Sequence, residues 1–129
     1  MVEIVPFRPE HLDEVLGLCS AEGWRSLPDD PARALRTLTA PGVTTLVAVA
    51  PDGVVGLAQV LGDGELRSYL ALLLVKQSRR REGHGTALVR AALEADRGGR
   101  LDLLSEAGST AFYERFAHRR LPGYRLYRT

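Results

Sequence analysis

The sequence predicts one domain built on a mixed α/β sheet, and three observations support this fold class. Apolar, β-branched runs alternate with stretches of helical periodicity along all 129 residues. Short turns join the middle runs, which makes their strands antiparallel neighbours. Later an amphipathic helix separates two buried runs, and such a unit forms a right-handed parallel crossover. The expected order is β-α-α-β-β-β-α-β-α-β, with no linker or repeat dividing residues 1–129.

One strand and two helices are expected at the start of the chain. Residues 2–7 alternate enough for a strand, and Gly23 follows the end of the first expected helix. The apolar residues at helical spacing in that helix are Leu12, Val15, Leu16 and Cys19. Asp30 followed by Pro31 is typical of an N-cap and the first position of a second, short helix.

A hairpin and a third strand follow. Residues 43–50 and 54–61 are rich in β-branched and apolar side chains, and the Pro-Asp-Gly sequence between them is typical of a turn. Residues 62–64 (Gly-Asp-Gly) make a second turn. Residues 70–75 are then an apolar run that predicts a buried strand.

The rest of the chain predicts the crossover and a tail. The helix expected after a basic loop has one apolar face, formed by Leu88, Val89, Ala92 and Leu93. This helix should stop near Gly98, and residues 101–104 should form a further buried strand. Residues 109–116 predict a short helix opened by a Ser or Thr cap, and residues 124–128 predict a last strand.

Composition and charge exclude several classes of function. A formal net charge of +1 rules out a broadly basic surface, so binding of nucleic acid by bulk electrostatics is not expected. A single cysteine, expected in the core, cannot close an intrachain disulfide, and no signal peptide or membrane-spanning run is visible. We therefore expect a cytoplasmic protein with no membrane partner. His11 and His118 lack metal-ligand spacing, so no metal site is expected.

A basic loop that contains glycine joins the strand at 70–75 to the amphipathic helix. The first N–H groups of a helix have no intrahelical partner, and the helix dipole favours an anion there. Gly83 and Gly85 lack a Cβ, which lets the backbone approach a phosphate closely. A Walker loop does not fit, because Gly85 is not followed by Lys and then Ser or Thr. A dinucleotide fingerprint does not fit either, because the residue three places after Gly85 is Leu88, which is not small.

The pattern Arg80-x-x-Gly83-x-Gly85 resembles the Arg/Gln-x-x-Gly-x-Gly/Ala signature with which the GNAT superfamily of N-acetyltransferases grips the pyrophosphate of acetyl-coenzyme A. The expected element order is also the GNAT order. Residues 111–115 (Ala-Phe-Tyr-Glu-Arg) are similar to a Phe-Tyr-Glu-Lys/Arg segment that GNAT members carry after the fifth strand. The resemblance spans almost the whole chain and implies a GNAT-like acyl-CoA N-acyltransferase fold, with a splay between strands 4 and 5.

The resemblance also implies a role for each matching residue. Backbone groups of Leu73 and Val75 would pair with the pantetheine arm in the splay. The pyrophosphate would be held by the Arg80 side chain and by the amides of the loop, which include Arg81, Gly83, His84, Gly85 and Thr86. Tyr113 would protonate the leaving thiolate, a task that suits a proton donor of high pKa. Trp24, between the first two helices, would line the acceptor pocket.

The resemblance leaves the general base open. Many GNAT members carry an acidic residue on the fourth strand, where this chain has Ala71 and Leu72. An amine with a pKa of about 10.4 must lose a proton before it attacks. The candidate for the general base, which would accept this proton, is Glu106, acting directly or through water. Many GNAT members have asparagine at this position. The alternative for Glu106 is a solvated carboxylate in a loop.

These inferences predict one function and leave two alternatives. The predicted function is direct transfer of the acetyl group of acetyl-coenzyme A to a primary amine in a ternary complex, since no Cys-His pair is evident for a covalent intermediate. The sequence leaves open whether the amine belongs to a small molecule, an amino acid or a protein, and whether the protein is a homodimer. The alternatives are a non-catalytic acyl-coenzyme A binding module and a nucleic-acid binder built on Arg79, Arg80 and Arg81.

Overall fold

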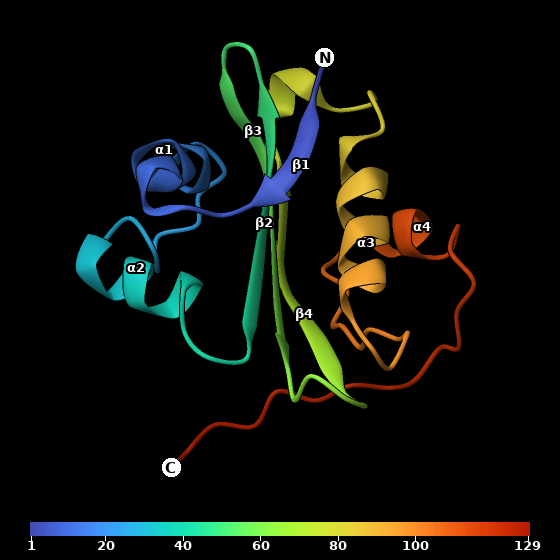
Figure 1. Cartoon of the computed structure of the whole chain (residues 1–129). Coiled ribbons are helices and arrows are strands. Elements are labelled where there is room, and N and C mark those ends of the chain that lie inside the picture. The colour runs from blue at the N-terminus through green and yellow to red at the C-terminus, as the bar shows by residue number, and fades with distance from the viewer.

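The computed structural model describes residues 1–129 and places a sheet between two layers of helices (Figure 1). The sheet has four antiparallel strands in the order β1-β2-β3-β4, which are Glu3–Pro6, Val43–Ala50, Gly53–Gly62 and Ser68–Val75. One face is covered by two helices, α1 (Leu12–Ala21) and α2 (Pro31–Leu38). The other face is covered by α3 (His84–Ala95), and the one-turn α4 (Thr110–Tyr113) lies beside α3 on the same side of the sheet. Two 3-10 turns complete the elements, at Pro9–His11 and Gln77–Arg79. The predicted mixed α/β class is confirmed.

The helix ends test the predicted caps. The Asp30 side chain accepts a hydrogen bond from the Arg33 N–H at 3.1 Å, as an N-cap does. Gly23, just past α1, has a φ of 77°, a left-handed conformation that glycine adopts without a steric penalty. Ser109 occupies the N-cap position of α4 as predicted, but its side chain makes no capping hydrogen bond, and the helix lasts one turn instead of extending to residue 116.

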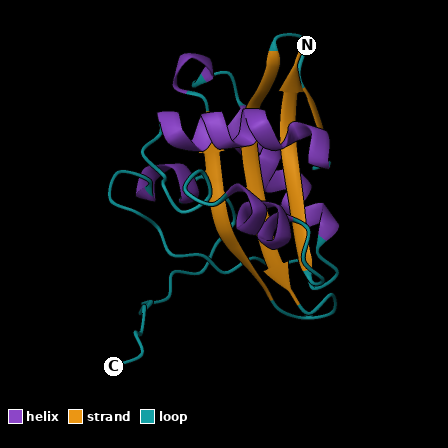
Figure 2. Ribbon diagram, turned by 90° about the vertical axis from the view of Figure 1, so that its left-hand side faces the viewer, coloured by secondary structure: helices purple, strands orange, loops and turns teal.

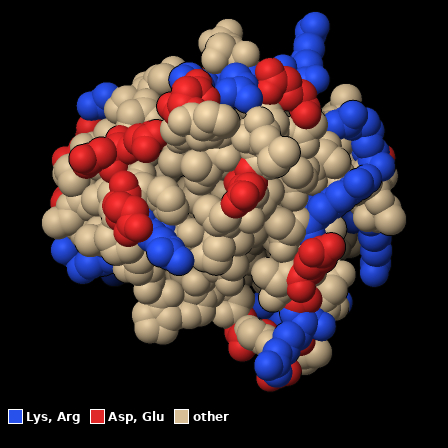
Figure 3. All heavy atoms as spheres, turned by 45° about the horizontal axis from the view of Figure 1, so that its top comes forward, with Lys and Arg blue, Asp and Glu red and all other residues tan.

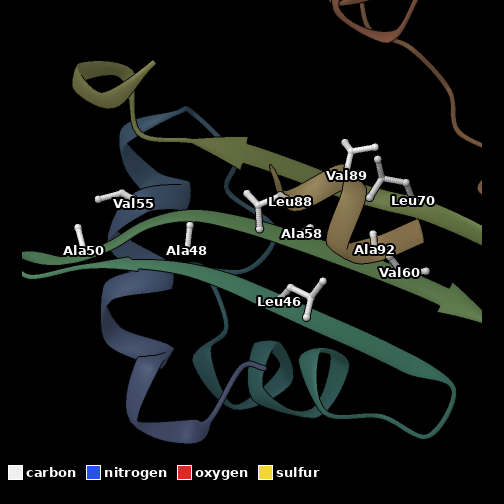
Figure 4. Packing of buried hydrophobic residues seen from close by; sticks show 10 residues of the cluster. All are labelled: Leu46, Ala48, Ala50, Val55, Ala58, Val60, Leu70, Leu88, Val89 and Ala92. Carbon is white, nitrogen blue, oxygen red and sulfur yellow. The ribbon is translucent and has the colours of Figure 1, made fainter. Parts of the chain in front are cut away.

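Two apolar clusters fill the spaces between the sheet and its helices. On the α1 side the largest fully buried side chains are Leu57, Val15, Val47 and Cys19. On the α3 side Leu88, Val89 and Ala92 pack onto β2, β3 and β4 (Figure 4). Leu88 is fully buried and lies over Gly56, where a Cβ would come within 2.9 Å of its Cδ1 atom. The absence of a side chain at Gly56 therefore lets α3 approach the sheet this closely.

Strand β4 contains one extra residue, which changes the direction of every side chain before it. Gln59 of β3 pairs with Leu72, but Val60 pairs with Leu70, so Ala71 has no counterpart on β3. Leu70 consequently packs in the cluster on the α3 side, whereas Leu72 packs in the cluster on the α1 side. Regular alternation would have placed both on the same face.

The strand predicted at residues 101–104 is reduced to a single bridge, so the prediction of a regular strand there is wrong. Asp102 pairs in parallel with Tyr69 through two backbone hydrogen bonds. The Leu70 N–H donates to the Asp102 carbonyl at 2.9 Å, and the Asp102 N–H donates to the Ser68 carbonyl at 3.0 Å. The parallel direction agrees with the predicted crossover through α3. No further bridge joins the two segments, because they diverge beyond Asp102, and this divergence is the splay expected between strands 4 and 5.

The strand predicted at residues 124–128 does not form. Residues 117–129, the C-terminal arm, make no backbone hydrogen bond and end as an extended tail away from the sheet (Figures 1 and 2). A strand needs partners for its N–H and C=O groups, and the arm forms no backbone hydrogen bond with any strand of this chain. Strand-like composition was therefore not sufficient to predict the pairing. No helix in the structure has the length and apolar character needed to cross a membrane.

Candidate active site

The free edge of β4 exposes backbone groups of Leu73 and Val75. The N–H of Lys76 donates to the Val55 carbonyl at 2.8 Å, so the backbone groups of Lys76 point towards β3. Alternation along a strand then turns those of Val75 and Leu73 towards the open edge. The Val75 carbonyl does face this side, because it accepts a hydrogen bond from Arg80 Nε at 3.2 Å. These are the two residues whose backbone was predicted to pair with a pantetheine arm.

Helix α3 begins beside this edge and presents free donors. Gly83 is its N-cap in a left-handed conformation with φ of 86°, and no atom lies within 4 Å of the place where its Cβ would be. The first hydrogen bond of the helix runs from the Ala87 N–H to the Gly83 carbonyl at 3.0 Å. The N–H groups of His84, Gly85 and Thr86 therefore have no partner within the helix. Open space and free donors coincide here, as binding of an anion requires.

Other side chains of the loop hold its shape. Arg79 forms ion pairs with Asp52 at 3.2 Å and with Glu82 at 3.0 Å, and His84 Nε2 lies 2.7 Å from the same Glu82 carboxylate. The hydrogen bonds from His84 and Arg79 lower the pKa of Glu82 and keep it charged. The His84 side chain thus fixes the loop, and its backbone N–H is left without a partner in the protein.

Arg80 and Arg81 differ in how free their side chains are. The Arg80 guanidinium donates to the Val75 carbonyl and forms an ion pair with Glu22, at the C-terminal end of α1. Arg81 makes no ion pair or side-chain hydrogen bond, and its φ of 68° is rare for a residue with a side chain. Arg81 is therefore the arginine of the loop that has a free guanidinium.

Three segments that are distant in the sequence meet at the start of α3. The ring of Phe112 lies over Gly85, where a Cβ would be 3.4 Å from the ring and 3.7 Å from a methyl group of Val75. Tyr113 packs edge-on against Phe112, with ring centroids 5.0 Å apart. Tyr113 is thus placed next to the loop and the open edge of β4.

The hydroxyl of Tyr113 keeps its proton and remains accessible. Half-burial raises the pKa of Tyr113, so the hydroxyl is protonated at neutral pH. No buried side-chain nitrogen or oxygen in the structure lacks a hydrogen-bond partner. The Tyr113 hydroxyl has no partner in the protein, so it must be open to solvent, and a bound molecule can reach it.

The sequence did not indicate Arg115 as a site residue. Its guanidinium lies 5.3 Å from the centroid of the Phe112 ring and 3.5 Å from the Thr86 hydroxyl. This position adds a positive charge at the first turn of α3. The signal in the sequence was the basic residue that ends the segment around Tyr113, but only the fold shows that it reaches Thr86.

A cavity of about 170 Å³ lies on the α1 side of β4. It is lined by α1, by the loop between α1 and α2, and by β3 and β4, through Cys19, Trp24, Ser26, Leu27, Gln59, Ala71 and Leu72. The extra residue of β4, Ala71, therefore borders both the strand irregularity and this cavity. Trp24 lies in the wall of this cavity and is 40% exposed, so its side chain is accessible to a molecule in the cavity. A larger hollow of about 370 Å³ lies at the opposite end of α3, around Asp63 and Asp96.

Two carboxylates are candidates for the proton acceptor. Glu106 is exposed in the turn before α4, where its carbonyl accepts a hydrogen bond from the Ser109 N–H at 3.0 Å and its carboxylate contacts no protein donor. Glu22 was not considered from the sequence. Its side chain is only 14% exposed, and its pairing with Arg80 holds it at the open edge of β4.

Comparison with known families identifies this arrangement. A family model described as an acetyltransferase (GNAT) domain matches residues 41–117, which is more than half of the chain. The chain belongs to the GNAT family of acetyltransferases. The matched part of this GNAT protein runs from β2 to α4, and so includes the open edge of β4, the loop before α3 and Tyr113.

Solved structures share the fold along the whole chain. A GNAT-family acetyltransferase from Streptococcus pneumoniae TIGR4 is 25% identical with a TM-score of 0.77, covering 99% of this chain and 98% of that one. AAC(6')-Iy, solved with the bisubstrate analog CoA-S-monomethyl-acetylneamine, is 20% identical with a TM-score of 0.80, covering 100% and 98%. A ribosomal-protein-alanine N-acetyltransferase from Brucella melitensis biovar Abortus 2308 is 18% identical with a TM-score of 0.78, covering 100% and 99%. No curated protein sequence matches the chain.

Proposed function

We propose that this GNAT protein transfers the acetyl group of acetyl-coenzyme A directly to a primary amine. The observation that carries the proposal is the meeting of the open edge of β4, the N-terminus of α3 and Tyr113 around Gly85. The pantetheine arm, the pyrophosphate and the leaving thiolate of acetyl-coenzyme A would each meet a suitable protein group there. Membership of an acetyltransferase family supports the same reaction.

The groups of the chain fit acetyl-coenzyme A, which would supply a reactive thioester. Backbone groups of Leu73 and Val75 would pair with the pantetheine arm in the way that an added strand pairs with a sheet edge. The amides of residues 84–86 would bind the pyrophosphate at the start of α3. The free guanidinium of Arg81 and the nearby charge of Arg115 would add electrostatic attraction, while Arg80 holds the end of β4 in place.

The acceptor amine would enter from the cavity bordered by Trp24 and Ala71. The amine must lose a proton before it attacks, and Glu106, acting directly or through water, is the residue that we propose as the base. Tyr113 would donate its proton to the departing sulfur, because its raised pKa keeps the proton in place until a base appears. Transfer would be direct, since Cys19 is fully buried and cannot act as a nucleophile.

The arrangement of charges disfavours the nucleic-acid alternative. Arg79 and Arg80 are both held in ion pairs with carboxylates of the same chain, which leaves Arg81 as the unpaired member of the triplet. Figure 3 shows acidic side chains among the basic ones over much of the face it presents, with basic side chains gathered along its right-hand edge. A non-catalytic acyl-coenzyme A binding module remains the alternative, and it differs in making no acetylated product.

A screen of amine acceptors with acetyl-coenzyme A tests the proposal, with release of free coenzyme A thiol as the readout. The protein itself should add no background, because burial raises the pKa of the Cys19 thiol to about 11 and shields it from reagents. Thiol release that depends on one class of amine supports the enzyme and names its acceptor. Binding of acetyl-coenzyme A without release for any amine would favour the non-catalytic module.

Replacing Gly83 by Val is expected to abolish stabilisation by acetyl-coenzyme A. The wild-type protein should gain about 2.7 kcal/mol at a ligand concentration a hundred times Kd, which raises its melting temperature. A branched side chain at Gly83 would occupy the space where the phosphate must approach.

Gly99→Val is a matched control for this variant. Gly99 is also left-handed, with φ of 70°, and also has open space around its Cβ position, but it follows α3 instead of preceding it. Both variants should therefore lose similar amounts of stability without ligand, and Gly99→Val should keep the full thermal shift. An equal shift in both variants would show that Gly83 lies outside the binding site.

A further inference from the structure

We propose that the cavity on the α1 side of β4 holds the body of the acceptor amine, and that this body is one compact, uncharged apolar group. The inference rests on the proposed acetyl transfer and adds to it the class of amine that is accepted. The cavity of about 170 Å³ is close in size to an apolar cavity of about 150 Å³ that holds one benzene molecule. A phenyl or branched alkyl group therefore fits inside it, whereas an amine built of several rings does not.

Apolar side chains form most of the cavity wall. Cys19 and Leu72 are buried, Leu27 and Ala71 are partly buried, and all four lack a charge. The exposed part of the Trp24 indole adds an aromatic surface, against which a flat ring packs well. A wall of this kind binds an apolar group because it removes the surface of that group from water.

The cavity lies beside the place where the acetyl group would be transferred. Ala71 and Leu72 line the cavity, and the next residue, Leu73, is one whose backbone pairs with the pantetheine arm in the proposed reaction. An amine whose body lies against Ala71 and Leu72 would have its nitrogen near the open edge of β4. The cavity would thus select the body of the acceptor, while the reacting nitrogen stays outside it.

The charges around the cavity disfavour an acceptor with a second positive charge. No charged residue lines the cavity. The carboxylates near it in the sequence are already engaged, because Glu22 pairs with Arg80 and Asp29 pairs with Arg25 at 2.7 Å. A second ammonium group would therefore be buried without a partner, which costs far more free energy than burial of its carbon chain returns. Diamines and polyamines should be poor acceptors for this reason.

Fluorescence and kinetics together test the proposal on the full-length protein. Trp24 is the only tryptophan of the chain, so its fluorescence reports on the wall of this cavity. With coenzyme A present, phenethylamine should change this fluorescence to saturation, and the diamine putrescine should leave it unchanged. In acetyl transfer, kcat/KM for phenethylamine should exceed that for putrescine by at least about tenfold, a factor that burial of one large apolar group supplies.

A larger side chain in the cavity wall provides the matching variant. Ala71→Leu fills part of the cavity, so it should raise the KM for phenethylamine by at least about tenfold and weaken the fluorescence response equally. The thermal shift with acetyl-coenzyme A should persist, which shows that the variant is folded and still binds the coenzyme. Ala40→Leu is the control, because Ala40 is also partly buried but does not line the cavity, and it should behave as wild type.

The outcomes separate this inference from the proposed reaction. Preferred transfer to putrescine, without a fluorescence response to phenethylamine, would overturn the inference while acetyl transfer stands. A saturable response to phenethylamine without thiol release from any amine would reject the enzyme but retain the cavity as a site for this class of amine. An Ala71→Leu variant with the wild-type response and KM would place the bound amine outside the cavity and overturn the inference.

Discussion

Replacing Tyr113 by Phe is expected to lower kcat by at least tenfold, with little change in the KM for acetyl-coenzyme A. Phe fills almost the same space against Phe112 but removes the proton donor, and general acid catalysis is typically worth about 10²–10⁴-fold. Binding should change little, because one neutral hydrogen bond contributes only about 1 kcal/mol. Steady-state rates on the best acceptor from the screen measure both constants.

Two comparisons make this prediction specific. Tyr124→Phe removes the same hydroxyl from an exposed tyrosine in the arm, and it should leave kcat unchanged. The loss in Tyr113→Phe should also shrink with acyl donors whose thiol leaves more readily, because their departure needs less protonation. A Tyr113→Phe variant as fast as wild type would show that the hydroxyl only packs beside the site.

Replacing Leu88 by Ala is expected to destabilise the fold by about 2–5 kcal/mol, the range for a large-to-small change in a well-packed core. Leu88 is fully buried between α3 and the sheet, and the neighbouring Gly56 has no side chain that could fill the vacated space. Urea unfolding measures the change as a lower midpoint with an unchanged slope. Leu66→Ala is the control, because Leu66 is 66% exposed and should change stability by less than about 0.5 kcal/mol. Equal effects at Leu66 and Leu88 would contradict the packing described for α3.

The sequence predicted those parts of the fold that depend on local chemistry. Asp30 caps α2 because its side chain reaches an N–H three residues ahead, a contact within one turn of helix. The strands at residues 43–50 and 54–61 were predicted because a short turn fixes which of them are neighbours. The glycine loop and the segment around Tyr113 were recognised from residue patterns, and the structure places them in contact through Gly85 and Phe112.

The parts that could not be predicted depend on partners far away in the sequence. Whether residues 101–104 and 124–128 form strands depends on which edge is within reach, and their own composition does not contain that information. The ion pair of Arg80 with Glu22 joins residues 58 positions apart, and neither belongs to a local motif that indicates the other. Arg115 approaches Thr86 only because Phe112 packs over Gly85.

The extra residue in β4 makes the facing of its side chains depend on the number of residues before and after Ala71. On either side of Ala71 the side chains alternate between the two faces, but across Ala71 the pattern reverses, so that Leu70 and Leu72 lie on opposite faces. A substitution at Ala71 does not change the number of residues in β4, so the side chains on both sides of it keep the faces that they now occupy. Deleting Ala71 would restore a regular strand and force one half of β4 to exchange the faces that point to α1 and to α3, so Leu72 would no longer face α1 if Leu70 kept its place. At this position the number of residues matters more to the architecture than their identity.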